Sequence, residues 1–97
     1  MILGFHPLAL QELDEAVAFY ELQQKGLGIT LLEEAERRFQ ALQTFPQRFA
    51  QVYKQYRRFP LDRYPYSVIY GIEQDLIYIV ALAHQARRPD YWHDRVE

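Results

Sequence analysis

The run from Leu76 to Ala83 constrains the fold more than any other part of the sequence. It is rich in β-forming residues, and it is apolar at both its odd and its even positions. Because successive side chains of a strand point to opposite faces of a sheet, such a strand needs cover on both sides. We therefore predict a central strand here. A second strand is predicted at Tyr66–Ile72, joined to the first by the hairpin-sized connection Glu73-Gln74-Asp75.

Two amphipathic helices upstream are predicted to cover one face of this sheet. The first should run from Pro7 to about Gln23, with an apolar stripe formed by Leu10, Leu13, Ala16, Val17 and Tyr20. The second should run from Gly28 to Phe45, with a stripe formed by Leu31 or Leu32, Ala35, Phe39 and Leu42. The turn at residues 25–28 makes the pair an antiparallel hairpin. Polar residues lie off both stripes: Gln11, Glu12, Asp14 and Glu15 on the first helix, and on the solvent-facing side of the second Glu33, Glu34, Glu36, Arg37, Arg38 and Gln40.

The other segments complete an α+β two-layer sandwich, with the helical hairpin packed on a mainly antiparallel β-sheet in the order β-α-α-β-β-β. Further strands are predicted at Ile2–Phe5 and Tyr56–Leu61, and Gln47–Gln55 is predicted to be a loop with room for a short strand. Residues 1–97 are expected to form a single domain. The sheet face away from the helices must be covered by the C-terminal segment or by a partner.

Composition limits the chemistry that this chain can perform. It contains no cysteine, which excludes disulfides and thiolate metal sites. Its three histidines, His6, His84 and His93, have no ligand-like spacing, so we expect no metal and no cofactor. There is no secretory signal and no apolar run of the roughly 20 residues that a membrane helix needs, so a cytoplasmic location is expected. The net charge of −2 argues against an extended nucleic-acid surface.

Candidate site residues gather between Lys54 and Arg95. The basic ones on the predicted strands and their exits are Lys54, Arg57, Arg58, Arg63, Arg87 and Arg88. Guanidinium groups bind phosphate in fork geometry and stabilise charge on a transferring phosphoryl group. The alternative is a solvated sheet edge with salt bridges to Asp62, Asp90 and Asp94. His84, just past the last predicted strand, is a candidate general acid or base; alternatively, its ring hydrogen-bonds the loop 87–92 and holds it in place.

Several motifs, in this order and at these spacings, resemble the RelE/ParE superfamily of type II toxin–antitoxin toxins, which includes plasmid-stabilisation proteins. The resemblance covers nearly the whole chain. The motifs are His6-Pro7 before an Ala/Glu-rich helix, Ala16-Val17-Ala18-Phe19-Tyr20, Gly26-Leu27-Gly28, Phe45-Pro46, Arg57-Arg58-Phe59-Pro60-Leu61, Arg63-Tyr64-Pro65-Tyr66-Ser67-Val68-Ile69-Tyr70, and His84 with Arg87-Arg88-Pro89-Asp90-Tyr91-Trp92 and Arg95.

The resemblance implies a growth-inhibiting toxin that forms an oligomer with a cognate antitoxin, whose tail wraps the sheet and helices. ParE-like members inhibit DNA gyrase, and RelE-like members are ribosome-dependent, metal-independent mRNA endonucleases. A third possibility is an inactive homologue that only binds the antitoxin. The nucleases typically carry an arginine in the middle strand, where this chain has Ser67, and a second one shortly after the last strand, near Gln85. These departures favour the ParE-like branch.

The resemblance also suggests a role for individual side chains. If the chain is a nuclease, Arg57, Arg58 and Arg87, with Lys54, would neutralise phosphate charge, and His84 or Tyr91 would transfer a proton. The remaining residues are predicted to bind a partner or target: Lys54, Arg63, Arg88, Trp92 and Arg95.

Overall fold

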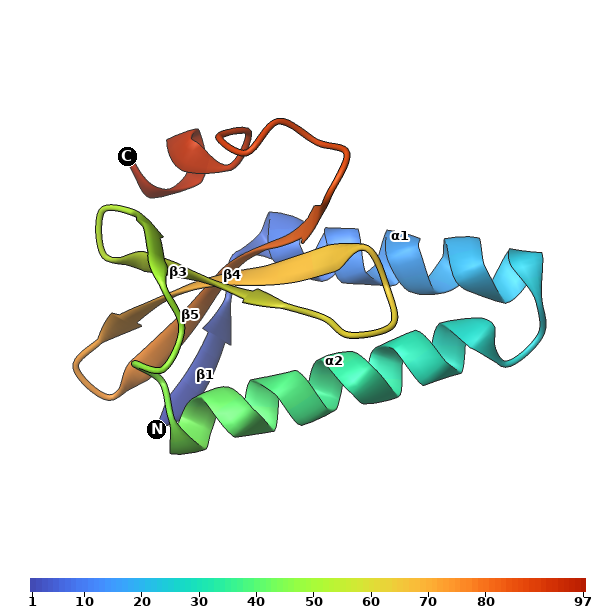
Figure 1. Ribbon diagram of the computed structural model, residues 1–97, viewed down its shortest axis with the longest axis horizontal. Coiled ribbons are helices and arrows are strands. Elements are labelled where there is room, and N and C mark those ends of the chain that lie inside the picture. The colour runs from blue at the N-terminus through green and yellow to red at the C-terminus, as the bar shows by residue number, and fades with distance from the viewer.

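The computed structural model describes residues 1–97 as a helical hairpin lying on one five-stranded sheet (Figure 1). The elements in chain order are β1 (Ile2–Phe5), α1 (Pro7–Gln23), α2 (Leu27–Thr44), β2 (Gln51–Tyr53), β3 (Tyr56–Pro60), β4 (Tyr66–Glu73), β5 (Leu76–His84) and a 3₁₀ helix, η1 (His93–Val96). The strand order is β1-β5-β4-β3-β2, with only the β1–β5 pair parallel. The predicted α+β sandwich is confirmed. Neither helix is long and apolar enough to cross a membrane.

Element bounds differ from the predicted ones at a few positions. The strand within the predicted loop 47–55 is formed, as β2. His84 is the last residue of β5 rather than a residue beyond it, because it pairs with Tyr66 on β4. β3 ends at Pro60, one residue before the predicted end. Proline has no N–H to donate, and β2 pairs only with the beginning of β3, so Pro60 occupies an unpaired edge.

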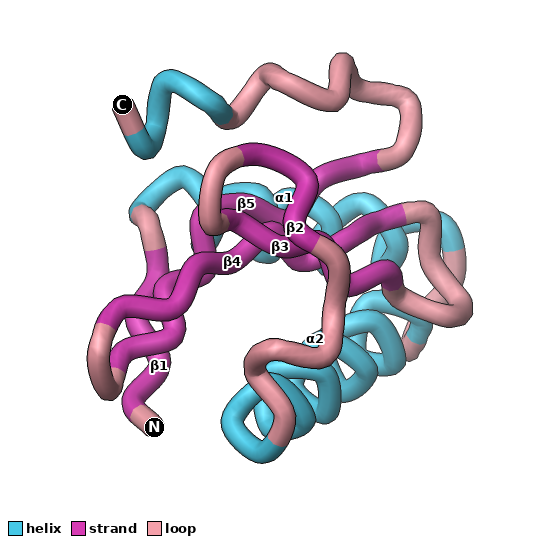
Figure 2. The backbone as a smooth tube through the Cα atoms, turned by 60° about the vertical axis from the view of Figure 1, so that its left-hand side comes forward, coloured by secondary structure: helices cyan, strands magenta, loops and turns pink.

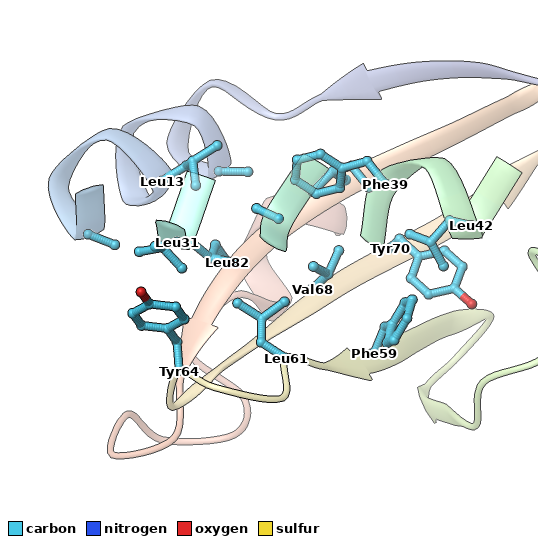
Figure 3. Packing of buried hydrophobic residues seen from close by; sticks show 14 of the residues in the cluster. Leu13, Leu31, Phe39, Leu42, Phe59, Leu61, Tyr64, Val68, Tyr70 and Leu82 are labelled. Atoms are coloured by element: carbon cyan, nitrogen blue, oxygen red, sulfur yellow. The ribbon is translucent and has the colours of Figure 1, made fainter. Parts of the chain in front are cut away.

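The main core lies between the helical hairpin and one face of the sheet. Figure 3 shows Leu13, Leu31, Phe39 and Leu42 of the helices facing Val68, Tyr70 and Leu82 of the sheet. The prediction for Leu10 was wrong, since 46% of this residue is exposed. Ala9, Leu13 and Ala16 form the buried line instead, at helical spacings of four and three. Leu10 lies about 100° around the helix from Ala9 and therefore points away from the sheet.

A β-bulge in β5 changes which of its positions face the helices, and apolar clusters cover the strand on both faces. Tyr70 pairs with Ile79 and Ile69 pairs with Ala81, so Val80 is an extra residue without a partner. Before the bulge Ile77 and Ile79 face the helices, and after it Leu82 does. Val80 and Ala81 belong to a second cluster on the other face. The prediction of a central strand covered on both sides is confirmed.

The chain's own C-terminal segment covers the second face. Figure 2 shows this segment crossing above the strands while α2 lies below them. Trp92 is only 2% exposed and packs with Tyr56, Ile69, Val80 and Ala81. Tyr56 in turn needs a glycine beneath it, because a Cβ at Gly71 would lie 2.7 Å from the tyrosine ring. The sequence left open whether the C-terminal segment or a partner covers this face, and in the structure the C-terminal segment encloses the cluster.

The β3–β4 loop is tied to α2 by a side chain whose predicted environment was wrong. Glu34 is 3% exposed rather than solvent-facing. Its Oε2 accepts a hydrogen bond from the backbone N–H of Asp62 at 2.6 Å and lies 3.6 Å from Nη2 of Arg38. The Tyr64 hydroxyl adds a hydrogen bond to the Leu27 carbonyl at 3.0 Å. The loop folds over this side of α2, which buries Glu34 in a way that helix periodicity does not reveal.

The turn between the helices is held by the carboxylate of Glu21. It accepts hydrogen bonds from the backbone N–H groups of Gly26, at 2.8 Å, and Gly28, at 3.0 Å. Gly26 has a φ of 91°, which favours glycine. At Gly28 an added Cβ would lie 2.4 Å from the Val17 carbonyl oxygen, so the two helices approach too closely there for a side chain.

Replacing Glu21 by glutamine is expected to weaken the pH dependence of stability on the acid side. The Gly26 hydrogen bond, with a smaller contribution from Gly28, lowers the pKa of Glu21 in the folded protein. A lowered pKa stabilises the fold above the unfolded-state pKa, and this stabilisation is lost as the pH falls through the folded-state pKa. Urea unfolding of both proteins at pH 7 and pH 3 measures the effect. Glu36→Gln, at an exposed position of α2, is the control, and identical pH profiles for all three proteins would contradict the prediction.

Candidate functional site

The sheet face that carries the C-terminal segment contains a hollow of about 410 Å³. Its residues come from β2, β3, β4, β5 and the segment after β5. They are Val52, Arg58, Ser67, Ile69, Ala83, His84, Gln85, Arg87, Arg88, Pro89, Asp90, Tyr91, Trp92 and His93. A hollow of this size falls within the usual range for ligand pockets.

The hollow brings together many, but not all, of the predicted site residues. Arg58, His84, Arg87, Arg88, Tyr91 and Trp92 line it. Arg57 does not, because neighbouring residues of a strand point to opposite faces. Its Nη1 instead donates to the backbone carbonyls of Gln47, at 3.0 Å, and Phe49, at 2.6 Å. Arg57 therefore braces the loop between α2 and β2.

The other predicted binding residues are spread over the molecule. Lys54, in the β2–β3 turn, lies 3.7 Å from the Glu97 carboxylate. Arg63 lines a separate hollow beside α2. At the rim of the main hollow, Arg88 lies 3.9 Å from the Asp90 carboxylate, which is one of the salt bridges of the solvated-edge alternative.

Glu12 of α1 connects the C-terminal segment to the open edge of β5. β1 pairs with β5 only as far as Ile79. Beyond that point the Leu82 N–H donates to Oε1 of Glu12 at 3.1 Å, and the Val80 carbonyl accepts from Nη1 of Arg95 at 3.1 Å. Arg95 also donates from Nη1 and Nη2 to the two Glu12 oxygens at 2.9 and 2.8 Å. These two side chains satisfy backbone groups that an unpaired sheet edge would leave open.

Two further predicted site residues, Tyr91 and Arg87, contact the Glu12 carboxylate. The Tyr91 hydroxyl donates to Oε2 of Glu12 at 2.8 Å, and Nη1 of Arg87 lies 3.5 Å from that oxygen. The Arg87 guanidinium stacks 3.6 Å from the Tyr91 ring centroid. Sequence reasoning missed this role of Glu12. No local pattern reveals it, because the partners lie between 70 and 83 residues further along the chain.

Electrostatics in and beside the hollow limit the chemistry that it can perform. Burial, followed by the hydrogen bond to Glu12, raises the pKa of Tyr91, so the phenol stays protonated and acts as a donor. The hydrogen bond to Glu12 raises the pKa of Arg95, which stays charged. Arg87, which lines the hollow, and Arg95, which does not, are both ion-paired with Glu12. The cation on the hollow without a carboxylate partner is Arg58.

The floor of the hollow is formed by the strand residues Val52, Arg58, Ser67, Ile69 and Ala83, and Arg58 is the charged one among them. Ser67 is 2% exposed, and its hydroxyl has no hydrogen-bond partner. At the end of β5, Nδ1 of His84 accepts a hydrogen bond from the Ala86 N–H at 2.9 Å, and its ring meets Tyr66 edge-on at 4.9 Å. His84 thus anchors the beginning of the segment that follows β5. The arrangement offers hydrogen-bond donors and apolar surface more readily than a concentrated positive charge.

Comparisons with known proteins agree with this architecture. The family model described as "ParE toxin of type II toxin-antitoxin system, parDE" matches residues 3–89. A solved structure described as "Chromosomal ParDE TA system from P. aeruginosa" superimposes with a TM-score of 0.77, and the match covers 87% of this chain and 95% of that chain. At 18% sequence identity this likeness shows the fold. No curated protein matches. The chain belongs to the ParE toxin family of type II toxin–antitoxin systems, within the RelE/ParE superfamily.

Proposed function

We propose that this protein is a toxin that inhibits DNA gyrase by binding to it and that a cognate antitoxin neutralises it. The observation that carries the proposal is the match to the ParE family over residues 3–89. The resemblance noted in the sequence links ParE-like members to gyrase and RelE-like members to the ribosome. In this chain the position of the nuclease arginine is occupied by Ser67, a buried and uncharged floor residue.

The geometry also supports binding over cleavage. A metal-independent nuclease needs cations aimed at the position where phosphoryl charge develops. Here Arg57 lies on the opposite sheet face, and Arg87 is directed at Glu12. The protonated Tyr91 is a poor general base. Arg87 and Tyr91 hold the C-terminal segment against Glu12, and Arg57 holds the loop between α2 and β2, so that the sheet and helices present a surface to a partner.

Purified protein is expected to inhibit gyrase-catalysed supercoiling at micromolar concentration, and its expression is expected to arrest growth with filamentation and DNA damage. Binding to gyrase would interfere with the catalytic cycle without consuming the toxin. Supercoiling of relaxed plasmid, resolved by gel electrophoresis, measures the effect, with a topoisomerase I relaxation reaction as the specificity control. Unchanged supercoiling at micromolar toxin would contradict the proposal.

A second candidate function is cleavage of ribosome-bound mRNA. The observation in its favour is that Arg58, His84 and Arg88 line one hollow large enough for a nucleotide. Primer extension on translated mRNA would then show cuts at a defined codon position, and Arg58→Ala would abolish them. Growth arrest without such cuts would exclude this function. Healthy growth of cells that express the chain alone would indicate an inactive homologue that only binds the antitoxin.

A further inference from the structure

The stretch from Arg37 to Leu61 contains no acidic residue, although the chain as a whole has a net charge of −2. Six of the chain's eleven Lys and Arg residues fall within it. It forms the end of α2, the following loop, β2 and β3, and the β3–β2 pair is one edge of the sheet. Figure 2 shows this loop running from α2 up to that edge. Positive charge is therefore concentrated along one side of an acidic molecule.

One accessible part of this side is the ridge formed by residues 45–48, of which Phe45, Gln47 and Arg48 are exposed. Phe45 is 60% exposed, although large aromatic side chains are usually buried. Arg48 is exposed as well. Both residues line two shallow hollows, of about 460 and 220 Å³, one formed by the loop itself and one that also includes Phe49 and Phe59. The ridge thus offers an apolar ring beside a cation, with concave surface around them.

Arg48 is free to bind, unlike several of its basic neighbours. Arg38 is ion-paired with Glu34 and Asp62, and Lys54 is paired with Glu97. Arg48 forms no ion pair. Its guanidinium carbon lies 5.8 Å from the Phe49 ring centroid, and Phe49 itself stacks on Phe59 at 3.8 Å. The side chain is therefore supported from below while its N–H groups remain available.

The ridge is also rigid, which reduces the entropy lost on binding. Arg57 donates to the carbonyls of Gln47 and Phe49, on either side of Arg48. At the start of the ridge, the Tyr70 hydroxyl donates to the Pro46 carbonyl at 2.7 Å. Two side chains from the sheet thus hold the backbone of this loop in one conformation.

We propose that the ridge at residues 45–48 docks an acidic, partly apolar segment of the toxin's protein target. The assignment rests on the proposed inhibition of gyrase by binding, and it names the toxin surface that makes the contact. Arginine binds a carboxylate through two parallel hydrogen bonds, and burial of Phe45 would supply apolar contact beside it. Arginine and aromatic residues dominate the binding energy of protein interfaces. Nucleic acid fits less well, because it needs many cations and is repelled by the negative net charge.

The double variant Phe45→Ala/Arg48→Glu tests the docking surface. Its inhibition of gyrase supercoiling and its affinity for gyrase, measured by biolayer interferometry, should each weaken at least about 10-fold. The control is Phe19→Ala/Lys25→Glu, which removes an aromatic residue of similar exposure (54%) and reverses an exposed charge near the far end of the hairpin. The control should inhibit as the wild type does. Thermal unfolding verifies that both variants fold, and Arg48→Glu alone replaces the double variant if its folding is impaired.

Three results would overturn the assignment of the ridge to the protein target. They differ in whether the proposed inhibition of gyrase survives and in what the ridge would bind instead. A double variant that inhibits and binds gyrase like the wild type would place the contact elsewhere and leave the proposed function intact. A wild-type protein without any effect on gyrase would remove the proposed function and this inference together. Binding of the wild type, but not of the double variant, to a short DNA duplex in the absence of gyrase would assign the ridge to nucleic acid.

Discussion

Replacing Glu12 by alanine is expected to lower the free energy of unfolding by about 3–5 kcal/mol, the usual cost of removing one partner of a buried ion pair. The Arg95 side chain is only 9% exposed, so its charge would be left unpaired and poorly solvated. The Tyr91 hydroxyl and the Leu82 N–H would lose their acceptor at the same time. Each of these buried donors would then lack a hydrogen-bond partner, and its lost hydration would lower the free energy of unfolding further.

Urea unfolding followed by far-ultraviolet circular dichroism measures this effect. Glu15→Ala is the matched control, because Glu15 is exposed on the same helix and accepts one long hydrogen bond, from Gln11 at 3.4 Å. Once the difference in helix propensity between glutamate and alanine is subtracted, the control should change the free energy of unfolding by no more than about 0.5 kcal/mol. Equal stabilities of the Glu12 and Glu15 variants would show that the Glu12 network contributes nothing.

A double-mutant cycle separates the ion pair from the other hydrogen bonds. Arg95→Met removes the charge and keeps much of the side-chain volume. In the Glu12→Ala background this substitution should cost much less than it does in the wild type, because the charge that it removes has already lost its partner. Additive effects would mean that Glu12 stabilises the fold mainly through Tyr91 and Leu82.

Replacing Trp92 by alanine is expected to cost about 3–5 kcal/mol, the range observed when large aromatic residues are removed from a core. Trp92 fills the centre of the second cluster and meets Tyr53 and Tyr56 edge-on, with ring centroids 5.7 and 5.9 Å away. Without it, Val80 and Ala81 would lose the side chain that covers them. The segment that walls the main hollow would lose its apolar contact with the sheet and would be held by Arg95 and Tyr91.

The substitution removes the only tryptophan, so circular dichroism rather than fluorescence must follow unfolding. Hydrogen exchange should accelerate in residues 85–97 before it does so in β4 and β5, since the segment can open locally. Phe19→Ala, at a 54% exposed position, is the control and should cost less than about 1 kcal/mol. Unchanged exchange in residues 85–97 would show that other contacts hold the segment.

The expected effects of Glu12→Ala and Trp92→Ala concern the same part of the molecule, the C-terminal segment. The C-terminal segment is attached to the sheet through Trp92 and to α1 through Arg95 and Tyr91. It carries residues that looked like candidates for phosphate chemistry. In the structure their polar groups largely bond to the protein itself. This is the physical reason why the proposed activity is binding of a protein target rather than cleavage of RNA.

The elements and the layers could be predicted from local sequence patterns. Helical periodicity, the proline at the start of α1 and the glycines between the helices are local signals, because they act on residues within a few positions of one another. The apolar run at Leu76–Ala83 likewise predicted a strand covered on both sides. The sequence also predicted that Arg57 and Arg58 point to opposite faces of the sheet, because they are neighbours on a strand. It did not reveal which of the two faces the hollow.

Which polar residues are buried, and what they bind, depends instead on how distant segments of the chain pack together. Glu12 and Glu34 have the same local pattern as exposed glutamates, and they are enclosed because segments far along the chain fold over them. The bulge at Val80, which turns Leu82 toward the helices, depends on how β4 and β5 pair. The exposed ridge at Phe45 depends on how the loop crosses the sheet edge. Such features arise from contacts across long stretches of sequence, and no periodicity within one segment encodes them.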